Sequence, residues 1–261
     1  MDSFNWKKLS IGALFVALGS TQIIKFQPKT TTVQKSPSPT PSPVPSTPIP
    51  NNVIIGNTNY LNGDANNLYG SNNALLGSFN NLAGNNNLLA GYQNTLIGSN
   101  NQLQGSVNVL AGNNNYLTGD ANGVIGNANG VVGNYNGIAG NLNGVIGSSN
   151  GVIGDVNNVY GVGNNVIGNV NSVGGISNNV GGNLNGVNGV QNTVIGNLNG
   201  VNGVANNVVG SQNTISGNLN TALGDGNLVL GGANFVAGSG NTVQSGTSSP
   251  FSFSNLRRYW T

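Results

Sequence analysis

The chain has 261 residues, of which only 5% are charged. It contains neither cysteine nor histidine, and its acidic residues are five aspartates. Such a composition supplies too few groups for ordinary acid–base, nucleophilic or metal chemistry. It therefore predicts a protein that is not an enzyme and that needs no cofactor or metal ion.

Basic residues are confined to the two ends of the sequence. The formal net charge is +2, but residues 56–244 contain four aspartates and no base. A nucleic-acid site needs basic side chains along a groove, so we expect no nucleic-acid partner. The seven basic residues are Lys7, Lys8, Lys25, Lys29, Lys35, Arg257 and Arg258.

Residues 1–27 have the composition of a targeting segment. Two lysines, Lys7 and Lys8, precede an apolar run of about 11 residues, and Gly19 and Ser20 follow it. The run is shorter than the ~20 residues that span a bilayer. We predict a secretory signal peptide, with an uncleaved single-pass membrane anchor as the alternative. Either one implies a secreted or cell-surface protein that contacts a membrane only through this segment, if it is retained.

Residues 28–50 read PKTTTVQKSPSPTPSPVPSTPIP. A stretch so rich in Pro, Ser and Thr cannot bury enough apolar surface to order itself, and it favours extended conformations. It is predicted to be a disordered linker.

Residues 51–244 are dominated by a seven-residue repeat. Glycine recurs at every seventh position from Gly56 to Gly238, which makes 27 heptads, and all but one have the form G-x-x-N-x-[VLI]-x, the exception having Ala222 at position six. A fixed short period is typical of solenoids, in which each unit buries its apolar side against its neighbours.

The heptad predicts a short strand and a corner. A helix is excluded because each interior glycine costs about 1 kcal/mol relative to alanine. The N-x-V-x segment alternates with period two, and G-x-x supplies the turn. Two heptads make the smallest coil that closes, so we predict two heptads per coil, with a three-sided coil of three heptads as the alternative. About 13 coils would form a rod of roughly 65 Å.

Positions four and six of the heptad are predicted to point inward. Stacked Val and Leu form two facing apolar files, and stacked asparagines satisfy one another's amides as a ladder. Glycine is expected at the corner because it permits positive φ and close approach of the backbone. The asparagines are thus interpreted as structural.

Position two of the heptad holds all the acidic residues of the repeats, namely Asp64, Asp120, Asp155 and Asp225. They are too dispersed along the sequence for a calcium cage of oxygen ligands. We expect them to be solvated turn residues.

A coil of two heptads would place alternate heptads on the same face. Position seven is almost wholly apolar on one face and mixed on the other, where Val132 and Ile146 stand among polar residues. A long exposed aliphatic strip normally marks an interaction surface. The candidate interaction face comprises Thr95, Ile97, Ile125, Ile153, Ile167, Thr193, Ile195, Val209, Thr221 and Leu223.

Residues 245–261 depart from the heptad and introduce Phe251, Phe253, Tyr259 and Trp260. Solenoid ends expose unpaired strands that need covering. The segment is predicted to be a C-terminal cap, with a partner-binding or sorting tail as the alternative.

Several heptads resemble a known family. GSQNTIS (210–216), GVQNTVI (189–195) and GSGNTVQ (238–244) are similar to the x-x-N-x-V-x-G repeats of ice-binding, ice-recrystallisation-inhibiting proteins of grasses. The resemblance implies a left-handed β-roll and ice as the partner. The alternative function is a structural or adhesive cell-surface solenoid that self-associates or forms fibres.

Overall fold

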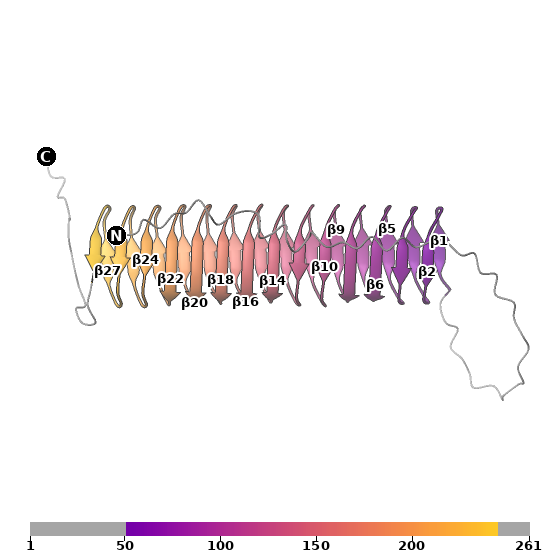
Figure 1. Ribbon diagram of the computed structural model, residues 1–261, viewed down its shortest axis with the longest axis horizontal. Coiled ribbons are helices and arrows are strands. Elements are labelled where there is room, and N and C mark those ends of the chain that lie inside the picture. The colour runs from indigo at the N-terminus through magenta and orange to yellow at the C-terminus, as the bar shows by residue number, and fades with distance from the viewer. Residues whose placement is uncertain (1–50, 245–261) are drawn as a thin grey trace, which may run out of the picture. The chain divides into compact units, whose positions relative to one another are not determined.

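The computed structural model describes residues 51–244, which form an all-β solenoid of two parallel sheets with fourteen strands each (Figure 1). Odd-numbered strands form one sheet, called sheet A here, and even-numbered strands form the other, called sheet B. The predicted fold class is confirmed. The predictions for residues 1–27, 28–50 and 245–261 lie outside the described residues.

Most strands are three residues long, seven strands of sheet B have five residues, and in Figure 1 the strands follow one another along the roll in chain order. Sheet A contains β1 (Val53–Ile55), β3 (Asn67–Tyr69), β5 (Asn81–Ala83), β7 (Thr95–Ile97), β9 (Val109–Ala111), β11 (Gly123–Ile125), β13 (Gly137–Ala139), β15 (Gly151–Ile153), β17 (Asn165–Ile167), β19 (Asn179–Gly181), β21 (Thr193–Ile195), β23 (Asn207–Val209), β25 (Thr221–Leu223) and β27 (Phe235–Ala237). Sheet B contains β2 (Tyr60–Asn62), β4 (Ala74–Leu76), β6 (Leu88–Tyr92), β8 (Gln102–Ser106), β10 (Tyr116–Thr118), β12 (Gly130–Val132), β14 (Gly144–Ser148), β16 (Asn158–Val162), β18 (Ser172–Ile176), β20 (Gly186–Val190), β22 (Gly200–Val204), β24 (Thr214–Ser216), β26 (Leu228–Leu230) and β28 (Thr242–Gln244).

The register of the strands fixes the size of the coil. Val145 of β14 pairs with Val131 of β12 and with Val159 of β16, so equivalent positions are two heptads apart. This confirms the two-heptad coil and excludes the three-heptad alternative. Fourteen coils form instead of about 13, because β1 comes from a heptad, residues 49–55, that starts with Ile49 instead of glycine. The left-handed sense stays a prediction.

The core is a thin layer between the sheets. Position six supplies one file of side chains from each sheet, mainly leucine in the first half and valine in the second, and nearly all of them are fully buried. Full burial of one such side chain stabilises the fold by about 1.5–3 kcal/mol. The predicted inward orientation of position six is confirmed.

Asparagine at position four forms the predicted ladder beside the apolar files. The Asn143 amide Nδ2 donates to Asn129 Oδ1 at 3.1 Å and to the Gly154 carbonyl at 2.7 Å. Its Oδ1 accepts from the backbone nitrogen of Asn157 at 2.9 Å and from Asn157 Nδ2 at 3.1 Å. Both ends of the amide are thus satisfied, which removes the cost of burying it.

Glycine at position one serves both purposes expected of it. Gly140 has φ +136°, and a Cβ built on it would lie 1.9 Å from the carbonyl oxygen of Gly154 in the next coil. Neither the conformation nor the space admits a side chain. The coils therefore stack at backbone contact along both edges of the roll.

Candidate functional site

All ten residues of the candidate interaction face lie on the outer side of sheet A. Register places position seven of successive coils directly side by side, as in Ile125, Ala139, Ile153 and Ile167. Ile125 is 62% exposed, whereas its neighbour Val124 is 1% exposed. The structure therefore brings these residues into two columns, one of position-seven side chains and one of position-five side chains.

The position-seven column is apolar over the length of sheet A. Isoleucine alternates with alanine from Ile97 to Ile153, and Ile167, Ile195, Val209 and Leu223 continue it beyond. These isoleucines are about half exposed or more. Adjacent coils are about 4.8 Å apart, so alternate isoleucines repeat at about 9.6 Å.

The position-five column is mostly polar or lacks a side chain, and its apolar members are Val53, Val109 and Phe235. Thr95, Thr193 and Thr221 are partly exposed here. Asparagines on neighbouring coils bond to each other: Asn67 Nδ2 donates to Asn81 Oδ1 at 2.8 Å, and Asn165 Nδ2 donates to Asn179 Oδ1 at 3.2 Å. The column of amides and hydroxyls thus runs parallel to the aliphatic column. Positions five and seven are two residues apart in each strand, so the two columns are separated by about 6.6 Å along the strand direction.

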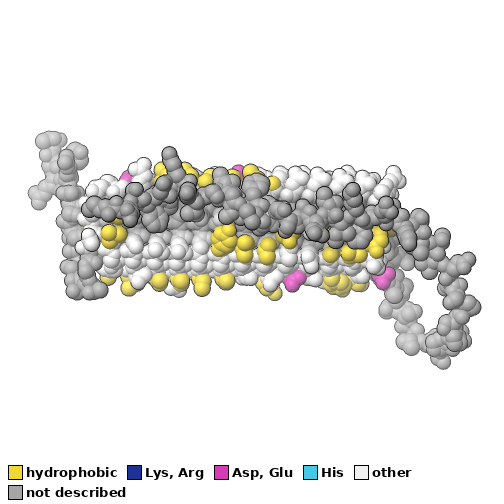
Figure 2. All heavy atoms as spheres, viewed as in Figure 1, with side chains coloured by type: hydrophobic (Ala, Val, Ile, Leu, Met, Phe, Trp, Pro, Cys, Tyr) yellow, Lys and Arg dark blue, Asp and Glu magenta, His cyan; other side chains and the backbone are white. Residues whose placement is uncertain are grey.

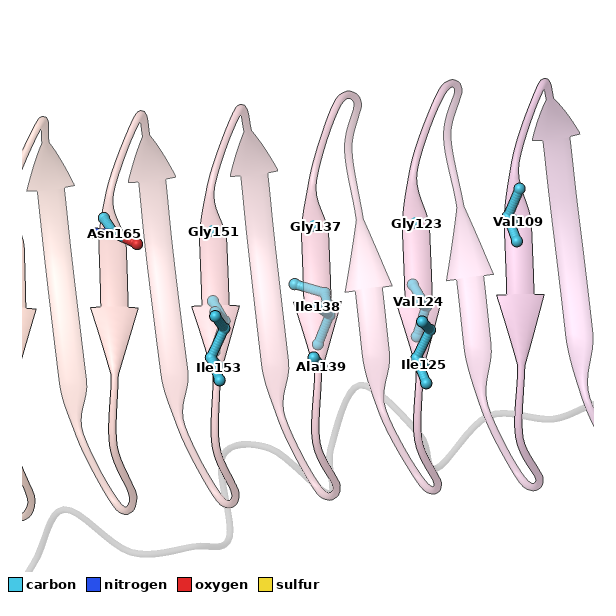
Figure 3. Close-up of a pocket in the computed structure, with 11 residues that line it drawn as sticks. Val109, Gly123, Val124, Ile125, Gly137, Ile138, Ala139, Gly151, Ile153 and Asn165 are labelled. Carbon is cyan, nitrogen blue, oxygen red and sulfur yellow. The ribbon is translucent and has the colours of Figure 1, made fainter.

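Three consecutive glycines at position five open a shallow groove in sheet A (Figure 3). A Cβ added at Gly123 or Gly137 would meet open space. The groove has a volume of about 390 Å³, with Ile125 and Ile153 along its side. In Figure 3 the labelled residues come from neighbouring strands of sheet A. This part of the face is therefore flatter along position five than the parts that carry Asn or Thr.

Neither sheet carries a charged side chain on its outer face within the described residues. Figure 2 shows apolar side chains in rows along the roll, and the few acidic side chains stand apart from one another. Sheet B differs from sheet A in its position-seven column, which includes Asn62, Gln104, Asn188, Asn202 and Ser216. The distinction between an aliphatic face and a mixed face, expected from the sequence, is present in the structure.

The aspartates at position two have a structural role that the sequence reasoning missed. Asp155 Oδ1 accepts from the backbone nitrogen of Asn141 at 2.7 Å and from Asn141 Nδ2 at 3.0 Å. Asp120 and Asp225 each accept one backbone N–H in the same way. The aspartates lie in exposed or partly exposed turns, as expected, and these three also belong to ladders along the edges of the roll. For Asp155 and Asp225 the overlooked signal is an Asn, Ser or Asp at position two of every second heptad.

The edges of the roll also carry aliphatic columns that were not predicted. Position three has positive φ in every coil, and at Val156 and Val170 φ is 60°. This conformation is unfavourable for β-branched residues. Asparagine, which tolerates it, occupies the same edge in the earlier coils, from Asn72 to Asn114. The exposed aliphatic column on this edge is Leu142, Val156, Val170, Leu184 and Leu198.

Within residues 51–244, no group of three or more His, Cys, Asp or Glu could hold a metal ion. In the same part of the chain, no helix is long and apolar enough to cross a membrane. The sites that can be described are thus extended surfaces of the roll.

Comparison with known proteins agrees with the geometry. No curated protein matches the chain. A family model does match, in two overlapping segments, residues 47–126 and 78–157, and its description is "Grass antifreeze beta roll". The matched segments include the coils of Ile97, Ile125 and Ile153. The repeat region, a β-solenoid in the structure, is thereby recognised as similar to the grass antifreeze β-roll family.

Proposed function

We propose that this protein binds ice through the outer face of sheet A and inhibits the growth or recrystallisation of ice. The match to the antifreeze β-roll family carries the proposal. Repeat solenoids of this kind are typical of proteins that are not enzymes. Their function depends on an extended surface and not on a catalytic centre.

The periodicity of sheet A supports ice as the partner. Ice is a lattice, so a surface that repeats at fixed intervals gains the same contact at every repeat. On sheet A, equivalent side chains of neighbouring coils are about 4.8 Å apart along the roll, and the two outward side chains of each strand are about 6.6 Å apart along the strand. Its side chains are uncharged, and an aliphatic column lies beside a column of amides and hydroxyls. Methyl groups order the water next to them, while amides and hydroxyls can bond into that ordered layer.

The rigidity of the roll also supports the proposal. The inner ladder and the apolar files hold every coil in register, so the outer columns are organised before any contact is made. A surface that is ordered in advance loses little conformational entropy on binding. A flexible chain of the same composition would lose more.

The test uses the full-length protein in an ice-recrystallisation assay, alongside two double variants. Replacing Ile125 and Ile153 with lysine introduces charge on sheet A at solvated positions. We expect loss of ice activity and an unchanged melting temperature, because neither side chain belongs to the core. The matched control replaces Val132 and Ile146, exposed on sheet B, with lysine and should retain activity. Equal loss from both pairs would contradict the assignment to sheet A, and an inactive parent protein would refute ice binding.

A second candidate function is self-association, favoured by the aliphatic columns on sheet A and along the edge. Exposed apolar strips of this length normally mark interaction surfaces. Light scattering on the parent and on the sheet A lysine variant distinguishes the two functions. A parent that is inactive on ice but assembles, and a variant that stays monomeric, would favour a structural or adhesive role. We place either role outside the cytoplasm, on the composition of residues 1–27.

A further inference from the structure

The two outer columns of sheet A vary in side-chain size along six consecutive strands of the sheet, β5 to β15. Position seven alternates between a small and a large residue, whereas position five has three side chains followed by three glycines. Along these strands, position seven reads Ala83, Ile97, Ala111, Ile125, Ala139 and Ile153. Position five reads Asn81, Thr95, Val109, Gly123, Gly137 and Gly151. In both columns, the order of large and small residues is inverted when the column is read backwards.

Both reversals have the same centre, which lies between β9 and β11. When position seven is placed opposite its own reverse about this point, Ile125 meets Ala111. In the same way, position five brings Val109 against Gly123. The other opposed pairs are Ile97 with Ala139, Ile153 with Ala83, Thr95 with Gly137, and Asn81 with Gly151. Every pair thus joins a large residue to a small one, whereas a centre on β11 itself would set isoleucine against isoleucine.

Such a pattern fits a second copy of the chain related by a twofold axis. Across a twofold axis, residue i of one copy meets residue j of the other and j meets i, so the same surface must complement itself. An axis parallel to the strands reverses the order of the coils and keeps position seven opposite position seven. An axis along the roll would instead set Ile97 against the partner's Thr95, which crowds them, and Ala139 against the partner's Gly137, which leaves a gap. The two columns therefore favour rolls that pack antiparallel.

We propose that a second copy of the chain packs antiparallel on the outer face of sheet A, centred between β9 and β11. The second copy fills the groove, which runs along the three glycines between Val109 and Asn165 (Figure 3). In the dimer, the partner's Val109, Thr95 and Asn81 lie over these glycines. Val109 is 51% exposed in the single chain, and this contact buries it.

The charge and the shape of the face suit this contact. No charged side chain lies on the outer face of either sheet in residues 51–244, so two copies do not repel each other there. The repeat region is straight in Figure 1, so the columns of both copies stay in line along the overlap.

The overlap is large enough for a weak dimer. Ten strands of each copy, β1 to β19, overlap about the centre, over about 48 Å of the roll and about 10 Å along the strands. The two faces together cover on the order of 1,000 Å², which is the lower limit for a specific interface, so the dimer is weak and reversible. Pairs of two large residues, such as Tyr69 with Ile167, occur only in the two outer strands at each end, where side chains can turn aside.

The dimer and ice compete for part of the same surface. The overlap covers Ile125 and Ile153, which the proposed function assigns to ice, and leaves β21 to β27 uncovered. This consequence rests on the proposed function, whereas the dimer itself does not. Ice activity per molecule should therefore decrease, without vanishing, over the concentration range in which the dimer forms.

Sedimentation equilibrium of the full-length protein, from micromolar to millimolar concentration, tests the dimer. We expect the average mass to rise from that of one chain toward that of two. Gly137→Leu places a side chain where the partner's Thr95 lies, so it should weaken association roughly tenfold or more. A Cβ at Gly137 meets open space, as does one at Gly186 on sheet B, so Gly186→Leu is the matched control and should associate like the parent. A parent that stays monomeric at millimolar concentration, or equal weakening by both substitutions, would overturn the proposal.

Cysteine crosslinking tests the register, because the chain has no cysteine of its own. In the antiparallel dimer Ala83 of one copy faces Ile153 of the other, but within one chain these residues are five coils, about 24 Å, apart. The double variant Ala83→Cys, Ile153→Cys should therefore form covalent dimers with a short thiol crosslinker. Neither single variant should do so, since equal positions of the two copies are also about 24 Å apart. Covalent dimers from a single variant, or none from the double variant, would refute this register and the proposal with it.

The ice assay separates the dimer from the proposed function. A parent that dimerises and crosslinks as expected but has no ice activity supports the dimer and refutes ice binding alone. A parent that is active on ice but remains monomeric refutes the dimer alone. Ice activity per molecule that stays constant while the dimer forms would show that the second copy does not cover the ice-binding residues, against the proposed register.

Discussion

Asn143 and Asn141 lie two residues apart and belong to different ladders, so they form a matched pair for measuring what burial adds to an asparagine ladder. Asn143 is 1% exposed and lies inside the roll, whereas Asn141 lies on the edge. Asn143→Ala would leave the Gly154 carbonyl without its donor and the Asn157 backbone N–H without its acceptor. Each buried group left unsatisfied costs about 1–3 kcal/mol, so we expect a loss of about 2–6 kcal/mol.

Asn141→Ala removes bonds of the same kind at the surface. Asn141 Oδ1 accepts from the Asn127 backbone nitrogen at 2.9 Å, and Asn141 Nδ2 donates to Asp155 at 3.0 Å. Water can replace these partners, so the expected loss is about 0.5–1.5 kcal/mol. Thermal melts followed by circular dichroism should separate the variants by several degrees, because each 1 kcal/mol shifts the melting temperature by about 2–4 °C at this chain length.

Repeat arrays can lose cooperativity, so hydrogen exchange should accompany the melts. In Asn143→Ala, faster exchange should be concentrated at the Asn157 amide and its neighbours. If the two variants melt alike, the inner ladder contributes no more than the outer one, and the reasoning from buried amides is wrong.

Two further predictions concern the corner and the core. Gly140→Ala should prevent local folding, because its Cβ would collide with the next coil, whereas Gly137→Ala should be tolerated because its Cβ meets open space; comparing their circular dichroism spectra and melts checks both. Val145→Asp should lower the free energy of unfolding by several kcal/mol, since it buries a carboxylate between apolar files without a partner, and a chemical denaturation curve like that of the parent would contradict the inward assignment.

The sequence predicts the short strands, the corners and the inward side chains because positions one, four and six of the repeat all indicate the same structure. Glycine, asparagine and an aliphatic residue recur at positions one, four and six, and each has a physical reason for its place. The period of seven does not itself distinguish a coil of two heptads from a coil of three. The contrast between the two position-seven columns supports two, because a coil of three heptads would not gather the aliphatic residues on one side.

The features that the sequence did not predict depend on positions of the repeat at which the residue type varies. Position three accepts Asn, Leu, Val and Gly, so its uniform positive φ is invisible in any single heptad. Its aliphatic run from Leu142 to Leu198 appears only when the sequence is written with two heptads in each row. The strand β1 was missed because its heptad has Ile49 where the others have glycine.

The template positions of the repeat and its variable positions contribute to function in different ways. Positions one, four and six hold the coils in register, and they would do so beneath any surface. The other positions determine whether a face is aliphatic, amide-rich or flat, as the difference between Ile153 on sheet A and Asn188 on sheet B illustrates. The template therefore specifies the scaffold, and the remaining positions specify what each face can bind. Substitutions at position seven, which leave the template intact, are therefore the changes that can assign the function of each face.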